Sequence, residues 1–195
     1  MYYADLRRYD VSNWSGINST LFVSGCTHMC EGCFNQEAWN FKYGKPYTKE
    51  VEDLFISYIK DEHVVGAWIL GGEPFQHDLD IIFHLVKRIK EETDKPIHMW
   101  SGYTWEELIK RDKCVDILLW VDTLVDGRFE LDKKDLTLKH KGSTNQREID
   151  VQESLKQGEI ILINPWQINK NLLYTILFCL LIINYIITYY FQLFY

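Results

Sequence analysis

The sequence has few basic residues for its length. Its 195 residues include 21 Lys and Arg against 28 Asp and Glu, which gives a formal net charge of -7. Nucleic-acid binding through the phosphate backbone needs a surface rich in Lys and Arg, and this composition does not indicate one. We therefore expect no nucleic-acid partner, and instead a small molecule or another protein.

The chain also lacks two features of secreted proteins. Its five cysteines are an odd number, and its first ten residues, MYYADLRRYD, contain no apolar stretch of the signal-peptide kind. In a reducing compartment, clustered cysteines indicate metal or redox chemistry rather than disulfides. We therefore expect a cytoplasmic protein.

Charge is absent from residues 171–195, NLLYTILFCLLIINYIITYYFQLFY. The segment is long and apolar enough to be a transmembrane candidate. It uses only residue types that AT-rich DNA tends to encode without selection on the product. We expect residues 1–167 to form one domain and residues 168–195 an apolar, accidental extension. A membrane anchor and a partner-binding helix are the alternatives, and we do not expect membrane association.

The rest of the chain alternates between strand and helix patterns, without repeats or Gly/Ser linkers. Helices are predicted over residues 48–61 and 78–92, and from Thr104, which is spaced from Glu107 as in a capping box. The predicted strands are residues 20–24, 65–70, 97–100, 116–121 and 159–163. This alternation favours βαβ units and a mostly parallel α/β sheet.

A conspicuous loop follows each of the first four predicted strands. These loops read GCTHMCEGC, GGEP, SGYT and DTLVDGR. In parallel α/β folds the carboxyl ends of the strands share one edge, where ligands bind. We therefore expect the four loops to converge on one site.

The first of these loops carries Cys26, Cys30 and Cys33, spaced Cys-x3-Cys-x2-Cys. Three thiolates this close can all reach one metal centre. Structural zinc usually has four protein ligands, and His28 is the nearby fourth candidate. An iron–sulfur cube held by three cysteines would leave one iron free. A set of three small core residues is disfavoured by the polar neighbours, and we expect His28 to lie outside the ligand set.

The second loop contains the motif Gly71-Gly72-Glu73-Pro74. A Gly-Gly pair after a strand is, by itself, only a turn. Glycines also let the backbone approach a ligand closely. The Glu73 carboxylate, or backbone carbonyls beside it, can bind an ammonium group through charge-assisted hydrogen bonds.

The cysteine spacing, followed by Phe34, resembles the signature of radical S-adenosylmethionine enzymes. Five segments together closely resemble the activating proteins of anaerobic (class III) ribonucleotide reductase: LFVSGCTHMCEGCFNQEAW, LGGEPF, WSGYTWEEL, VDTLVDGRFE and GSTNQREID. The resemblance covers about residues 2–166. SNWSGINST departs from the family's pattern, because it keeps Gly16 but lacks a proline and a charge, so we assign Asn18 no role.

The resemblance implies one [4Fe-4S] cluster per chain, with Cys26, Cys30 and Cys33 as its ligands. It also implies an S-adenosylmethionine site, and no catalytic residues beyond the ligands of the cluster and the cofactor. The expected contacts of the cofactor are Gly32, Cys33, Phe34, Gly72, Glu73 and Ser101. Ser101, with Gly102 and Tyr103, would line the nucleoside pocket or form a plain turn. Asp122, Asp126 and Arg128 would meet a partner or solvent, and residues 142–147 would be a structural loop.

The implied fold is an incomplete, open (β/α) barrel with about five or six parallel strands. The implied activity is that of a radical S-adenosylmethionine oxidoreductase, whose 5′-deoxyadenosyl radical takes a hydrogen atom from a glycine of the large reductase subunit. The implied partners are that subunit and an electron donor such as flavodoxin. The activase of another glycyl-radical enzyme and a zinc-binding interaction module remain the alternatives.

Overall fold

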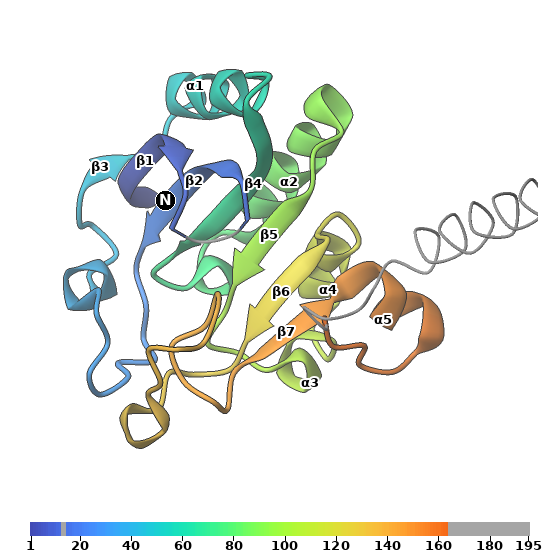
Figure 1. Ribbon diagram of the computed structural model, residues 1–195. Coiled ribbons are helices and arrows are strands. Elements are labelled where there is room, and N and C mark those ends of the chain that lie inside the picture. The colour runs from blue at the N-terminus through green and yellow to red at the C-terminus, as the bar shows by residue number, and fades with distance from the viewer. Residues whose placement is uncertain (13–14, 164–195) are drawn as a thin grey trace, which may run out of the picture. The chain divides into compact units, whose positions relative to one another are not determined.

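A seven-stranded mixed sheet forms the centre of the computed structural model, which describes residues 1–12 and 15–163 (Figure 1). The strand order is β3-β1-β2-β4-β5-β6-β7. The strands are β1 (Tyr2–Asp10), β2 (Ile17–Ser24), β3 (Lys45–Pro46), β4 (Val64–Gly71), β5 (Ile97–Trp100), β6 (Thr123–Asp126) and β7 (Arg147–Asp150). Within the described residues, β3 and β7 each have one neighbouring strand in the sheet, so the sheet is not closed.

The four central strands, β2, β4, β5 and β6, are parallel to one another. Antiparallel pairs flank them, with β1 and β3 on one side and β7 on the other. The number of parallel strands is therefore smaller than the predicted five or six. The register places Val23 opposite Gly71 and Trp100 opposite Val125, so the carboxyl ends of the parallel strands lie along one edge.

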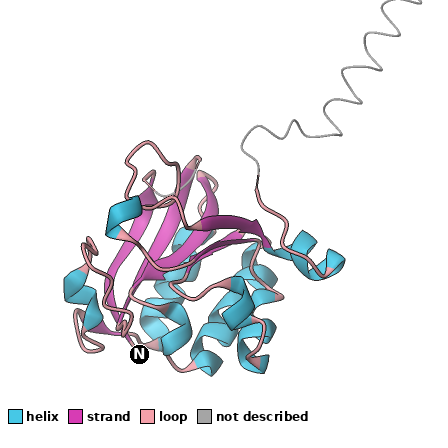
Figure 2. Cartoon of the chain, turned by 90° about the horizontal axis from the view of Figure 1, so that it is seen from below, coloured by secondary structure: helices cyan, strands magenta, loops and turns pink. Residues whose placement is uncertain are grey.

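Most helices lie on one face of this sheet (Figure 2). They are α1 (Lys49–Ile59), α2 (Leu79–Thr93), α3 (Trp105–Leu108), α4 (Asp112–Leu118) and α5 (Val151–Gln157), with short 3-10 helices η1 (Gln36–Trp39), η2 (Pro74–Gln76) and η3 (Leu131–Lys133). Helix α2 begins after Asp78, whose side chain caps it, and ends at Asp94 in the left-handed conformation. Its buried face follows helical spacing: Ile82, Leu85, Val86 and Ile89.

Side chains that alternate along the strands divide between two hydrophobic clusters. Leu21 and Val23 of β2 and Ile69 of β4 point to the helices and join the main core. The intervening positions form a smaller cluster on the opposite face: Phe22, Trp68, Leu70 and Val125, with Ala4 and Trp100 packed against them. This alternation has the period of two that a pleated strand imposes.

The prediction of a strand over residues 116–121 is wrong. These residues begin in helix α4, and the strand of this region is β6, which starts at Thr123. Cys114, Ile117, Leu118 and Val121 are fully buried, and their spacing is that of one helix face. A short apolar run allows both interpretations, and here its packing into the main core decides between them.

The prediction of a strand over residues 159–163 is also wrong. Apart from one isolated bridge between Leu162 and Ile149, this segment is not paired in the sheet. Strands β1, β3 and β7 and helix α5 were not predicted, partly because β1 carries many charged residues. In α1, Phe55, Ile56 and Ile59 are buried in the core, whereas Leu54 is exposed.

Two expectations about the carboxyl-terminal region lie outside the described residues. They are the domain boundary at residue 167 and the status of residues 168–195. Among residues 1–12 and 15–163, the structure contains no helix that is both long and apolar enough to cross a membrane.

Candidate functional site

Three loops and the end of β6 meet at the carboxyl edge of the parallel strands, where backbone hydrogen bonds join them. The amide of Gly72 donates to the Val23 carbonyl at 2.7 Å, and the amide of Glu73 donates to the Gly25 carbonyl at 2.8 Å. On the other side, the amide of Ser101 donates to Val125 at 2.9 Å. The predicted convergence therefore holds for the first three loops. The fourth predicted loop, residues 122–128, is largely strand β6, and only its last residues reach this edge, where the Gly127 amide donates to the Tyr103 carbonyl at 3.1 Å.

The cysteine loop begins directly after β2 and is closed at its base by η1. The amide of Gly25 donates to the Ala38 carbonyl at 2.6 Å, and the amide of Cys26 donates to the Trp39 carbonyl at 3.2 Å. Gly32 has a φ of 72°, in the left-handed region that favours glycine. Cys26, Cys30 and Cys33 are free thiols and partly exposed.

At two of these thiols, burial and backbone N–H groups have opposite effects on the pKa. Burial raises the pKa of Cys26, and the backbone N–H of His28 opposes this by donating to the sulfur. Burial likewise raises the pKa of Cys30, opposed by the backbone N–H of Phe129. Metal binding to these thiols would therefore release protons. Hydrogen bonds to the cysteine sulfurs also help to set the reduction potential of iron–sulfur clusters.

The chemistry of this loop fits a cluster held by three thiolates. Its donors are three thiols within eight residues, from Cys26 to Cys33. The Nε2 atom of His28 lies 3.1 Å from Glu73 Oε2, so this nitrogen is occupied and is not offered as a fourth ligand. Within the described part of the chain, no three His, Cys, Asp or Glu side chains are already gathered around one metal position. The three thiols thus share a loop without being preassembled.

Gly72 lies where two backbones approach closely. A Cβ atom built on it would lie 2.5 Å from the Gly25 carbonyl oxygen and 2.9 Å from the Gly25 nitrogen. Such distances are shorter than any ordinary contact, so this position requires glycine. The sequence had suggested close approach to a ligand, whereas the structure shows close approach to the cysteine loop.

The side chain of Glu73 is buried behind that contact, with 1% of its surface exposed. Its carboxylate accepts four hydrogen bonds, from Phe75 N at 3.1 Å, Ser101 Oγ at 2.9 Å, Gly102 N at 2.6 Å and His28 Nε2 at 3.1 Å. Sequence reasoning placed Glu73 and Ser101 at one edge but missed the donors on His28 and Gly102. The only signal for them was their place on neighbouring loops.

The other predicted cofactor contacts lie on the outer part of the cysteine loop. Phe34 is 78% exposed, and the backbone of Gly32 lies against the Leu131 side chain. No contact between Phe34 and the Glu73 group is observed among the described residues. The roles predicted for Gly32, Cys33 and Phe34 remain predictions.

Asp126 and Asp122 do not share a loop, contrary to the sequence-based expectation. Asp126 ends β6 and is buried, and it accepts from the Trp105 amide at 2.7 Å and from Arg147 Nε at 2.9 Å. Arg147 also pairs with Glu106 at 2.8 Å and lowers the pKa of that carboxyl to about 2. This ion-pair group therefore joins β6, β7 and α3.

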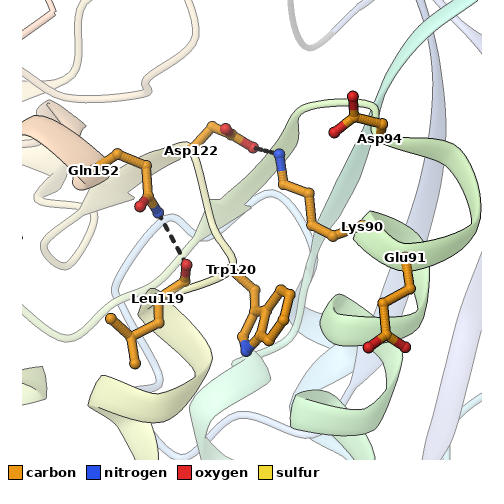
Figure 3. A pocket seen from close by; sticks show the side chains of 7 residues that line it. All are labelled: Lys90, Glu91, Asp94, Leu119, Trp120, Asp122 and Gln152. Carbon is orange, nitrogen blue, oxygen red and sulfur yellow. Dashed lines mark hydrogen bonds and ion pairs between the residues drawn. The ribbon is translucent and has the colours of Figure 1, made fainter.

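Asp122 precedes β6 and lies at the opposite edge of the sheet. It accepts from the Ile97 amide at 2.7 Å and pairs with Lys90 at 2.7 Å. Lys90 and Asp122 line a surface pocket of about 410 Å³ together with Gln152 (Figure 3). The pocket lies at the amino ends of the strands, so it does not belong to the cysteine site.

The loop over residues 142–147 is held by its own side chains. Gln146 accepts from the Gly142 amide at 2.8 Å and donates to the Gly127 carbonyl at 3.0 Å. Asn145 donates to the Arg128 carbonyl at 2.8 Å. These bonds support its interpretation as a structural loop, which fixes the segment after β6.

Comparison with known proteins agrees with the chemistry of the site. The family described as "4Fe-4S single cluster domain" matches residues 12–149, which include all three clustered cysteines. The chain is 43% identical over 141 residues to the anaerobic ribonucleoside-triphosphate reductase-activating protein of Vibrio cholerae, covering 70% of this chain and 90% of that protein. It is 39% identical over 150 residues to the protein of the same name from Pasteurella multocida, covering 75% and 95%. The corresponding protein of Enterobacteria phage T4 is 34% identical over 142 residues, covering 71% and 86%.

Proposed function

The chain belongs to the family of anaerobic ribonucleoside-triphosphate reductase-activating proteins and has a 4Fe-4S single cluster domain, and from this premise we propose that it is a glycyl-radical activase of the radical S-adenosylmethionine type. Its protein substrate would be the large subunit of anaerobic ribonucleotide reductase. The observation that carries the proposal is the three-thiol loop packed, through Gly72 and Glu73, against the carboxyl edge of a parallel sheet.

The proposed cluster ligands are the thiolates of Cys26, Cys30 and Cys33, one to each of three irons. Two observations support this set. The backbone amides of His28 and Phe129 partly offset the rise in pKa that burial causes at Cys26 and Cys30, and so favour the thiolate form that a cluster needs. The His28 ring is turned to Glu73, so the loop offers three thiols and leaves one iron for a further ligand.

The proposed S-adenosylmethionine site lies beside this loop. The backbone of Gly72 and Glu73, which contacts Gly25 at the base of the loop, would meet the amino-acid end of the cofactor. Ser101, on the neighbouring turn, and Gly32, Cys33 and Phe34, on the loop itself, would meet the rest. The exposed ring of Phe34 provides an aromatic surface for the nucleoside.

A reduced cluster held by these thiolates would supply the single electron for cleavage of S-adenosylmethionine, and so the chemistry for hydrogen abstraction from the substrate glycine. The residues of this chain bind and orient the reactants. An electron donor such as flavodoxin is proposed as the second partner. The sheet would be the open (β/α) barrel of the radical S-adenosylmethionine type within a domain of residues 1–167, and its open edge would admit a glycine-bearing loop.

The test is anaerobic activation of the reductase. The chain, reconstituted with iron and sulfide, is mixed with a reductant, S-adenosylmethionine and the large reductase subunit, and electron paramagnetic resonance then reports a glycyl radical. We expect the radical with the wild-type chain and none with Cys30→Ser, because that variant loses a thiolate ligand. Cys114→Ser is the matched control, since Cys114 is buried in the core on α4.

Two results would contradict the proposal at different levels. A wild-type chain with an intact cluster that forms no radical on this subunit would indicate the activase of another glycyl-radical enzyme. A purified chain that stays colourless, and holds zinc instead of iron, would indicate a zinc-binding interaction module.

A further inference from the structure

The Glu73 carboxylate has no obvious acceptor site left for a ligand. A carboxylate offers about four lone-pair sites, and the Glu73 oxygens already accept from four donors. Its side chain is 1% exposed, so an incoming ammonium group would have to displace one of these buried bonds. Unsatisfied buried donors are costly, which argues against such an exchange.

The donors of Glu73 come from three different strand ends. His28 lies in the cysteine loop after β2, Phe75 follows β4, and Ser101 and Gly102 follow β5. Because a carboxylate can only accept, the Nε2 atom of His28 carries the hydrogen of their contact. The carboxylate therefore ties the cysteine loop to the turn after β5.

The His28 ring is fixed by packing as well. Its side chain is 5% exposed, and it meets the Tyr103 ring edge-on at 4.6 Å between centroids. A Cβ atom on Gly102 would lie 2.4 Å from His28 Cδ2, so the ring lies directly against the Gly102 backbone. Both surfaces hold the imidazole in the orientation that reaches Glu73.

A second chain of hydrogen bonds joins the same three segments. The amide of Thr27 donates to Gln76 Oε1 at 2.7 Å, and Gln76 Nε2 donates to the Tyr103 hydroxyl at 3.2 Å. The cysteine loop is thus attached twice between Cys26 and Cys30, each time through the segment after β4.

We propose that Glu73 and His28 act together as positioning residues, which fix the cysteine loop to the turn after β5, and that Glu73 does not itself bind the ammonium group of S-adenosylmethionine. This inference rests on the proposed function for the identity of the ligand, but the attachment itself is a property of this chain.

The first test compares two ligands and three variants on the reconstituted full chain. The ligands are S-adenosylmethionine and its analogue without the amino group, and equilibrium binding gives Kd for each. If ligand binding requires the attached form of the loop, losing this hydrogen bond should raise Kd by up to about tenfold, the factor that corresponds to a hydrogen bond to a charged group. We expect His28→Leu and Glu73→Gln to weaken both ligands by the same factor, and His28→Gln, which keeps a donor, to restore Kd to within about threefold.

The opposite pattern would overturn the inference. If Glu73 binds the ammonium group, Glu73→Gln weakens S-adenosylmethionine alone and leaves the analogue unaffected. Equal affinity in His28→Leu and the wild type would also overturn it. His63→Leu is the matched control, because the His63 side chain is 69% exposed and lies between α1 and β4.

Hydrogen exchange of the same full chain separates this inference from the proposed function. We expect the amides of residues 25–34 to exchange faster in His28→Leu than in the wild type, and at the wild-type rate in His28→Gln. Unchanged exchange in His28→Leu would overturn the attachment. A wild-type chain that took up no iron would overturn only the proposed function, because the exchange measurement does not depend on iron.

Discussion

Single residues at the edge of the sheet decide how closely its loops pack. Gly72 carries no Cβ, and only this lets the segment after β4 lie on the backbone of Gly25. Gly158, by contrast, has a φ of 73° and no atom within 4 Å of its would-be Cβ. One glycine is required by a contact and the other only by backbone conformation.

We predict that Gly72→Ala destabilises the chain by about 2 kcal/mol, since overpacking of this kind costs about 1–3 kcal/mol. It would also reduce cluster loading, because the base of the cysteine loop must move. Denaturant unfolding and iron analysis measure the two effects. Gly158→Ala should cost only about 1 kcal/mol and leave iron content unchanged. Equal iron content in both variants would contradict this account of Gly72.

His98 on β5 is the residue for which we predict a pH dependence. It is buried and stacks on Trp68 at 4.8 Å, and burial lowers its pKa to about 4 from an ordinary 6.5. The unfolded chain therefore binds a proton at His98 more readily between these values. The unfolding free energy consequently falls as pH drops from about 6.5 towards about 4, and His98 adds no further loss below that.

Between about pH 7.5 and pH 5 the His98 contribution should amount to about 2 kcal/mol of lost stability. Denaturant unfolding at the two pH values measures it. His98→Phe keeps a ring beside Trp68 but removes the titration, so its loss over this interval should be smaller by that amount. His63→Phe, at an exposed position, should behave like the wild type. An identical pH dependence in His98→Phe and the wild type would contradict the assignment.

At the scale of elements, α1 and α3 each have a threonine at the N-cap position, but only one of the two threonines makes a capping hydrogen bond. Thr104 accepts from the Glu107 amide at 3.3 Å and its own amide donates to Glu107 Oε2 at 2.8 Å, a complete capping box at the start of α3. Thr48 occupies the N-cap of α1 but makes no side-chain capping bond. An N-cap threonine therefore contributes a capping hydrogen bond to the stability of α3 but not to that of α1.

We predict that Thr104→Val costs about 1 kcal/mol of stability, because it removes a capping acceptor with little change of shape. Thr48→Val is the matched control and should cost less than half as much. Thermal unfolding of the two variants measures the difference. If both cost the same, the capping box of α3 contributes nothing beyond the residue type.

At the scale of the whole molecule, the described core draws its residues from Leu21 to Val151, with Ile160 packed against it. Strand β7 and helix α5 contribute Ile149 and Val151 to that core. Removing the residues after Gln167 therefore removes none of these contacts, whereas removing β7 and α5 exposes the side of β6.

We predict that the chain trimmed after Gln167 folds, with its thermal midpoint within about 3 °C of the full chain, and still binds iron. Soluble yield, thermal unfolding and iron content check this. The chain trimmed after Gln146, which lacks β7, should fail to fold. If the chain trimmed after Gln167 is also insoluble, the accidental-extension hypothesis for residues 168–195 is wrong.

The amino-acid sequence by itself determined the features that depend on neighbours along the chain. The spacing of Cys26, Cys30 and Cys33 places three thiols within reach of one metal centre, and the capping box of Thr104 and Glu107 locates the start of α3. Strand order, with the rule that parallel strands share a carboxyl edge, was enough to predict that the loops converge.

Only the tertiary structure decided the features that depend on neighbours across the sheet. The four donors of Glu73 come from three strand ends, and Gly72 meets a backbone 47 positions earlier, so no local pattern could indicate either contact. The boundary between α4 and β6 was likewise settled by burial against α2 and the sheet, because a short apolar run has no period long enough to distinguish a helix from a strand.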